Sequence, residues 1–94
     1  MEEVEFDSVK DARNEDQRGL TFRFAALIFE GPFVEEEDRR DDYGETRIVA
    51  TGPIAEFGDR IFVVVYTWRD GRRRIISFRK ANDREIRKYR TGIA

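Results

Sequence analysis

Cysteine and histidine, which carry much of protein chemistry, are both absent from this 94-residue chain. Without cysteine the chain can form neither a disulfide nor a thiolate metal site, a composition that suits a reducing cytoplasm. Without histidine it has no imidazole ligand for a metal and no Ser-His-Asp or Cys-His mechanism. Any acid-base catalysis must therefore use carboxylates, lysine, tyrosine or water.

Long apolar runs are also lacking. No segment approaches the roughly 20 apolar residues needed to span a bilayer, and the acidic start Met1-Glu2-Glu3-Val4-Glu5 lacks the positive charge of a secretory signal. We therefore expect a cytoplasmic protein with no membrane partner. The length predicts one domain over residues 1–94, and 39% hydrophobic residues are enough to form a core despite 40% charged ones.

Charge is divided unevenly between the two halves of the chain. Residues 1–45 hold 15 acidic and six basic side chains, whereas residues 46–94 hold five acidic and 12 basic ones. The basic half contains Arg72-Arg73-Arg74-Ile75-Ile76-Ser77-Phe78-Arg79-Lys80, where cations flank the β-branched residues typical of a strand. A cationic strand in a slightly acidic protein is a candidate phosphate-binding surface.

The expected fold class is α+β: a small antiparallel sheet with two N-terminal helices and a C-terminal helix. Residues 4–6 alternate as a short strand does, and either Asp7 or Ser8 can cap a helix over residues 9–18. Apolar side chains within 22–29 recur at helical spacing and predict a second helix. The charged run 34–44 is predicted to be an exposed loop or a frayed strand connection.

Three strands in an antiparallel meander are expected in the second half. The continuous apolar run 61–68 is typical of a central strand. Asp70-Gly71 favours a two-residue hairpin turn, and Gly52-Pro53 marks either the end of the first strand or a bulge. Asn82, followed three residues later by Glu85, fits a capping box at the start of the last helix.

The chain resembles the BrnT toxin family over nearly its whole length. The residues that carry the resemblance are Phe6-Asp7, Lys10, Asn14, Gly19, Phe22, Ala25, Phe29, Tyr43-Gly44-Glu45, Arg47, Gly52, Val63–Tyr66, Arg74-Ile75-Ile76-Ser77, Arg79-Lys80-Ala81, Glu85 and Tyr89. The stretch from Arg74 to Ala81, followed by Glu85 and Tyr89, is the most specific part. The family usually has Trp before the first Asp and His before the glycine that ends the first helix, where this chain has Phe6 and Arg18.

The resemblance implies a metal-independent ribonuclease toxin of a bacterial type II toxin–antitoxin pair, with no cofactor and a fold similar to the RelE-like microbial ribonucleases. Such a toxin cleaves RNA and inhibits translation and growth. Its implied partner is a BrnA-like antitoxin with a ribbon-helix-helix end. The two proteins would form a hetero-oligomer, and the antitoxin would bind the operator DNA. Because the usual histidine is missing, the alternative is a non-catalytic module that binds an antitoxin or nucleic acid.

RNA carries its own nucleophile, the 2′-hydroxyl, so the protein need only bind phosphate, remove a proton and stabilise the developing negative charge. Arg74 and Arg79 are candidate phosphate binders because a guanidinium matches phosphate oxygens in bidentate fashion, with structural ion pairs as the alternative. Strict strand alternation places Ser77 and Arg79 on one face and Arg74 and Lys80 on the other. The alternative is that Arg74 and Lys80 lie at the strand ends, where twist and loop geometry relax this rule.

The proton acceptor has three candidates, namely Glu45, Lys80 and Glu85. Lys10 and Arg18 are either RNA contacts from the first helix or ordinary solvated charges, and Tyr89 either packs the last helix or positions a phosphate. The aromatic residues Tyr66, Trp68 and Phe78 either belong to the core or stack on bases. We predict a catalytic set of Arg74, Arg79, Lys80 and Glu45 and an RNA-binding set of Lys10, Arg18, Ser77 and Tyr89.

Overall fold

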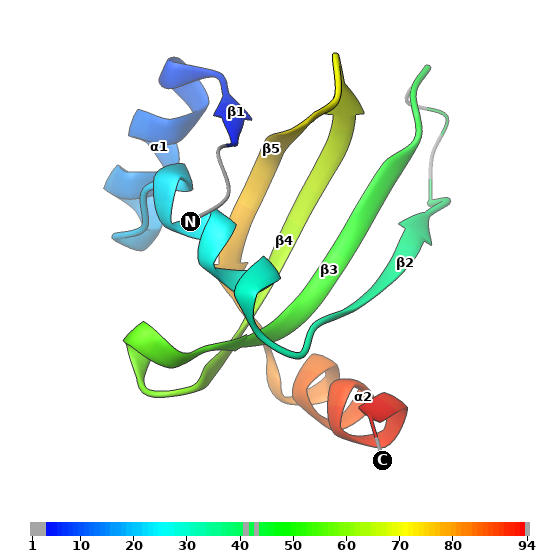
Figure 1. The fold of residues 1–94 in the computed structure, drawn as a ribbon. Helices are drawn as coiled ribbons and strands as arrows, with labels where there is room; N and C mark the ends of the chain where they lie inside the picture. Colours follow the sequence, from blue (N-terminus) through cyan, green and yellow to red (C-terminus); the bar gives the residue numbers. More distant parts are fainter. Residues whose placement is uncertain (1–3, 41, 43, 94) are drawn as a thin grey trace.

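A computed structural model describes residues 4–40, 42 and 44–93, so the first three residues and Tyr43 of the family pattern lie outside it. The elements along the chain are β1 (Glu5–Phe6), α1 (Ser8–Arg18), the 3₁₀ helix η1 (Phe22–Glu30), β2 (Val34–Asp38), β3 (Arg47–Ile54), the short 3₁₀ helix η2 (Ala55–Phe57), β4 (Arg60–Arg69), β5 (Arg72–Lys80) and α2 (Asp83–Ile93). Figure 1 shows a twisted sheet with α1 beside β5 and α2 at one end. Within the described ranges, no helix is long and apolar enough to cross a membrane.

The sheet is mixed, which corrects the expectation of an antiparallel one. Its strand order is β1-β5-β4-β3-β2, and the predicted meander β3-β4-β5 is confirmed. The short β1, however, pairs with β5 in parallel, with Glu5 opposite Arg74. Such pairing joins residues far apart in the chain, and no local pattern reveals it.

Part of the expected loop at 34–44 is the edge strand β2, which pairs antiparallel with β3. Carboxylates of this acidic strand have partners on neighbouring elements. Glu35 accepts a hydrogen bond of 2.6 Å from the hydroxyl of Tyr66, and Glu36 accepts one of 2.8 Å from Lys88. Of the two expectations for this run, the loop is wrong for residues 34–38, which form a strand, because composition shows the charges and not the groups that compensate them.

Helix α1 begins and ends as its sequence predicts. The carboxylate of Asp7 accepts hydrogen bonds from the backbone N–H groups of Lys10 and Val9, which lower the pKa of Asp7. At the other end Gly19 has φ 70° and donates its N–H to the carbonyl of Glu15. A left-handed residue of this kind is most easily a glycine.

Residues 22–30 form a 3₁₀ helix rather than the expected α-helix. Its start is fixed by the carboxylate of Asp11, which accepts a hydrogen bond of 2.6 Å from the N–H of Phe22. Phe22, Ala25 and Ile28 are fully buried at intervals of three residues. This interval matches three residues per turn, so packing favours the tighter helix.

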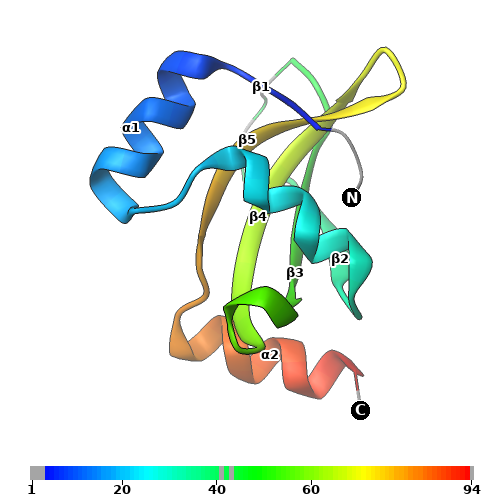
Figure 2. The same cartoon turned by 60° about the vertical axis from the view of Figure 1, so that its left-hand side comes forward.

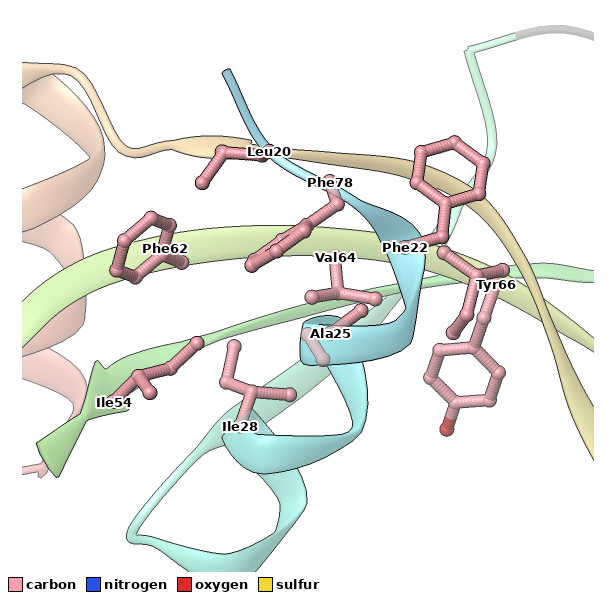
Figure 3. Close-up of a cluster of buried hydrophobic side chains, with 11 residues drawn as sticks. Leu20, Phe22, Ala25, Ile28, Ile54, Phe62, Val64, Tyr66 and Phe78 are labelled. Carbon is pink, nitrogen blue, oxygen red and sulfur yellow. The ribbon is translucent and has the colours of Figure 1, made fainter. Parts of the chain in front are cut away.

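The hydrophobic core lies between η1 and one face of the sheet, here called the core face (Figures 2 and 3). The buried cluster consists of Leu20, Phe22, Ala25, Ile28, Ala50, Ile54, Phe62, Val64, Tyr66, Ile75 and Phe78. Tyr66 and Phe78 are thus core residues, whereas the side chain of Trp68 is 51% exposed.

Strand β3 continues through Gly52 and Pro53 to Ile54, so this pair neither ends the strand nor forms a bulge. A Cβ atom on Gly52 would lie 3.0 Å from the Cα of Phe33. The glycine is therefore needed because the chain between η1 and β2 crosses close to the sheet. Pro53 lies beyond the residues paired with β2, at an edge where proline is tolerated.

Candidate functional site

A β-bulge in β5 decides which of its side chains share a face. Val65 of β4 is opposite Ser77, but the next residue, Tyr66, is opposite Ile75, so Ile76 is an extra residue in β5. The buried Ile75 and Phe78 consequently share the core face although they are three positions apart. The strict alternation assumed from the sequence is wrong at this point.

The bulge places Arg74, Ser77 and Arg79 together on the other face of the sheet, here called the groove face. Directly opposed residues share a face, and the rows across it are Thr67–Arg74, Val49–Val65–Ser77 and Thr51–Val63–Arg79. Sequence alternation had separated Arg74 from the other two. On the neighbouring β4, the rows of Arg74 and Arg79 are separated by a strand length of about 13 Å.

Arg79 and Glu85 form a bidentate ion pair across the groove face. The two η nitrogens of Arg79 donate hydrogen bonds of 2.7 and 2.8 Å to the two carboxylate oxygens of Glu85. The pair raises the pKa of Arg79 and lowers the pKa of Glu85, and the backbone N–H of Asn82 lowers the pKa of Glu85 further.

The predicted capping box fixes this carboxylate in position. Glu85 accepts a hydrogen bond of 3.0 Å from the backbone N–H of Asn82, and the side chain of Asn82 accepts one of 2.8 Å from the N–H of Glu85. Glu85 is therefore held from two sides, by the cap at the start of α2 and by Arg79 of β5.

A groove of about 600 Å³ separates α2 from the sheet. Its lining consists of Val34, Glu35, Glu36, Arg40, Val49, Thr51, Asn82, Arg84, Glu85, Lys88, Tyr89 and Gly92. Tyr89 forms part of the wall, its hydroxyl donates a hydrogen bond to the carbonyl of Pro32, and burial raises the pKa of Tyr89. The groove is thus walled by charged and apolar groups and has Glu85 at its border with Arg79.

Arg74 lies at the other end of the groove face, beside β1. Its guanidinium is 2.5 Å from the carboxylate of Glu5, and both side chains are partly exposed. The positive charge of Arg74 also contributes to the lowered pKa of Asp7. Two of the predicted phosphate binders, Arg74 and Arg79, are therefore both held by carboxylates.

Lys10 and Arg18 lie in a different place from the groove. They line a smaller cleft of about 180 Å³ between α1 and β5, together with Arg13, Asn14, Gln17, Phe22 and Ile76. Arg18 donates a hydrogen bond of 2.6 Å to the side-chain oxygen of Asn14.

Glu45 and Lys80 are not brought to Arg79. Glu45 precedes β3 at the end of the sheet that holds the β4–β5 hairpin, and its carboxylate is 3.8 Å from Arg47. Lys80 is opposite Phe62, a residue of the core face, and is exposed. Their predicted catalytic roles stay predictions, because each would have to act away from the groove.

The surroundings of two arginines were not predicted. Arg40 lines the groove, and its charge lowers the pKa of Glu85; within an acidic and basic run nothing distinguished it. Arg73 lies on the core face with its guanidinium 3.8 Å from the ring centre of Phe29 and 4.7 Å from that of Trp68.

In the part of the chain that the structure describes, no three His, Cys, Asp or Glu side chains are placed to hold a metal ion.

Comparison with known proteins identifies the family. Residues 6–85 match the family described as the ribonuclease toxin BrnT of type II toxin-antitoxin systems. The chain belongs to the BrnT family. This BrnT chain also matches the crystal structure of the Brucella abortus ribonuclease toxin BrnT, with a TM-score of 0.62 and 19% sequence identity, over 88% of this chain and 100% of that one. At that identity the match supports the α+β fold alone. Among curated proteins, no match to this BrnT-family chain is found.

Proposed function

We propose that this chain is an endoribonuclease and that RNA binds along the groove face. Membership of a ribonuclease toxin family is the observation that carries the proposal. The bulge at Ile76 supports the location, because it gathers Arg74, Ser77 and Arg79 on one face. That face leads into the groove beside α2, whose volume of about 600 Å³ falls in the usual range for small-ligand pockets.

The spacing of the two arginines suggests two phosphates rather than one. Arg79 neutralises the charge that develops at the scissile phosphate, and the hydroxyl of Ser77 orients one of its oxygens. Arg74, about 13 Å away along the strand direction, holds another phosphate of the same RNA strand. In this proposal guanidinium groups stabilise the charge, and cleavage needs no metal ion.

The other predicted residues have less direct roles. Tyr89 lines the groove and can contact the nucleotide held there, while Lys10 and Arg18 extend the path of the RNA across the cleft beside α1. We retain Glu45 and Lys80 as predicted catalytic residues, to be tested by alanine substitution, although neither lines the groove. Loss of activity in either variant would place part of the chemistry outside it.

The biological role proposed here is that of a single-domain, cytoplasmic toxin with a RelE-like fold, which inhibits translation and growth by cutting RNA. Membership of a type II toxin–antitoxin family implies an antitoxin partner. We propose that this partner is BrnA-like, with a ribbon-helix-helix end that binds operator DNA, and that it neutralises the toxin in a hetero-oligomer.

A second candidate function is a non-catalytic module that binds an antitoxin or nucleic acid. The observation that favours it is that both candidate phosphate-binding arginines form ion pairs within the protein. Arg79 is paired with Glu85, and Arg74 is paired with Glu5. Both cations then have structural partners, and the usual histidine is replaced by Arg18, which donates its hydrogen bond to Asn14.

Incubation of the purified, antitoxin-free protein with RNA in the presence of a chelator distinguishes the two. The ribonuclease proposal expects cleavage, a large loss of cleavage in Arg79→Ala, and unchanged cleavage in the control Arg60→Ala, an exposed arginine at the start of β4. Absence of both cleavage and growth arrest on induction, with normal antitoxin binding, would favour the non-catalytic module.

A further inference from the structure

Glu85 is the carboxylate that the groove brings closest to the proposed phosphate position. It lines the groove from the start of α2, and its two oxygens receive both η nitrogens of Arg79 at 2.7 and 2.8 Å. A phosphate bound to Arg79 would therefore lie beside Glu85. The attacking 2′-hydroxyl is adjacent to the scissile phosphate in RNA, so a carboxylate at this position is a candidate to accept its proton.

The hydrogen bonds of Glu85 leave one oxygen able to accept another proton donor. Its Oε1 accepts from Arg79 and from the backbone N–H of Asn82, whereas Oε2 accepts from Arg79 alone in the described structure. A carboxylate oxygen has two lone pairs. Oε2 therefore accepts one hydrogen bond fewer than Oε1 and keeps the capacity to accept another.

We infer that Glu85 is the general base for RNA cleavage and that the groove between α2 and the sheet holds the nucleotide whose 2′-hydroxyl attacks. This inference rests on the proposed ribonuclease function. In the step, the 2′-oxygen forms a bond to phosphorus and the bond from phosphorus to the 5′-oxygen breaks. Glu85 takes the 2′-proton, water protonates the leaving 5′-oxygen, and Glu85 then returns its proton to solvent. The products are a 2′,3′-cyclic phosphate and a 5′-hydroxyl.

The groove has the groups that this nucleotide would need. Arg40 adds a second positive charge near Glu85, and Val49 and Thr51 form the floor of the groove on β3. Arg79 lowers the pKa of Glu85, so the carboxylate is ionised and able to accept a proton at neutral pH but is a weaker base while the ion pair is intact. A phosphate bound to Arg79 would compete with Glu85 for the same η nitrogens, and weakening this ion pair would raise the pKa of Glu85 again.

The test uses variants that separate the base from the helix cap. Glu85→Gln keeps the capping box, since glutamine also accepts the backbone N–H at this position, but it cannot take the proton. Glu85→Asp keeps a carboxylate on a shorter side chain. Asp83→Asn removes one negative charge from the exposed first turn of α2 and is the matched control.

With a short single-stranded RNA, we expect Glu85→Gln to lower the rate constant of cleavage by about 100-fold or more, the usual contribution of a general base. Its RNA affinity should be equal to or higher than that of the wild type. Glu85→Asp should keep measurable cleavage, and Asp83→Asn should cleave at the wild-type rate. Thermal unfolding of each variant verifies that the fold is retained.

Three results would overturn the inference. One is wild-type cleavage by a folded Glu85→Gln, and another is cleavage of a substrate whose nucleotide at the cut site is 2′-deoxy. The third is weaker RNA binding by Glu85→Gln in proportion to its loss of rate, which would make Glu85 a structural residue. If the wild type does not cleave RNA at all, the ribonuclease proposal itself fails, and the role of Glu85 fails with it.

Discussion

The side-chain amide of Asn14 donates a hydrogen bond of 2.9 Å to the backbone carbonyl of Phe78, which is 64 positions later in the chain. The same nitrogen donates to the carbonyl of Leu20 at 3.0 Å. Asn14 is 4% exposed, so it connects α1 to the edge of β5 where β1 no longer pairs with it. The smaller cleft between α1 and β5, which Lys10 and Arg18 line, depends on this connection for its shape.

Asn14→Ala should lower the free energy of unfolding by about 2–4 kcal/mol, because two buried carbonyl groups lose their donor. Asn14→Asp should be at least as unfavourable, since an ionised carboxylate cannot donate to either carbonyl. Gln17→Ala, an exposed change on the same helix, is the control and should have an effect of about 0.5 kcal/mol or less. Chemical denaturation measures all three, and an Asn14→Ala as stable as Gln17→Ala would contradict the role assigned to Asn14.

The pH dependence of stability follows from Glu85. Its pKa is lower in the folded state than the ordinary value of 4.5, so its ion pair stabilises the fold above that value. The stabilisation is lost as the pH falls through the folded-state pKa. Wild-type melting temperatures should therefore fall more steeply than those of Glu85→Gln between about pH 5 and pH 2. If the melting temperatures of the two proteins changed in parallel with pH, protonation of Glu85 would not be linked to folding.

Arg74 should contribute to RNA affinity through charge. Replacing it by alanine removes one phosphate contact, so the slope of the logarithm of the binding constant against the logarithm of the salt concentration should decrease by about 0.7. Arg87→Ala, an exposed change of the same charge on α2, is the control and should leave the slope unchanged. Fluorescence anisotropy with labelled single-stranded RNA at several salt concentrations measures both. An unchanged slope in Arg74→Ala would remove Arg74 from the RNA path.

Gly52→Ala should destabilise the protein by about 1–3 kcal/mol, as overpacking does, because the new Cβ would lie 3.0 Å from the backbone of Phe33. Gly92→Ala provides the contrast. Nothing lies within 4 Å of a Cβ at that position, and alanine in a helix is more favourable than glycine by up to about 1 kcal/mol. Urea denaturation should therefore shift in opposite directions for the two variants. A neutral Gly52→Ala would show that the chain near Phe33 can move away.

Sequence patterns correctly predicted those caps, turns and strands that are determined by residues close together in the chain. The caps at Asp7 and Asn82 depend on residues two or three positions away, and both are present as expected. The turn at Asp70-Gly71 has the positive φ angles that the dipeptide favours, 52° and 76°. Apolar continuity likewise located β4 as the central strand.

Features that depend on distant neighbours could not be read from the sequence. The bulge at Ile76 exists because β5 must match β4 on the core face at both Ile75 and Phe78, and its position is not visible in β5 alone. The resulting face of Arg74 was therefore assigned wrongly. The ion pair of Arg79 with Glu85 joins the predicted phosphate binder to one of the three candidate bases, and only geometry could choose between them.

The buried apolar cluster and the ion pair at the edge of the groove come from different parts of the chain. Every member of the buried cluster is at or before Phe78, whereas Arg79, Glu85 and Tyr89 all follow it. A chain that stopped at Ala81 would keep the whole apolar cluster and lose both Glu85 and Tyr89. Tyr89 is itself buried, and its hydroxyl donates a hydrogen bond to the carbonyl of Pro32. Helix α2 therefore adds packing to the rest of the protein as well as one wall of the groove.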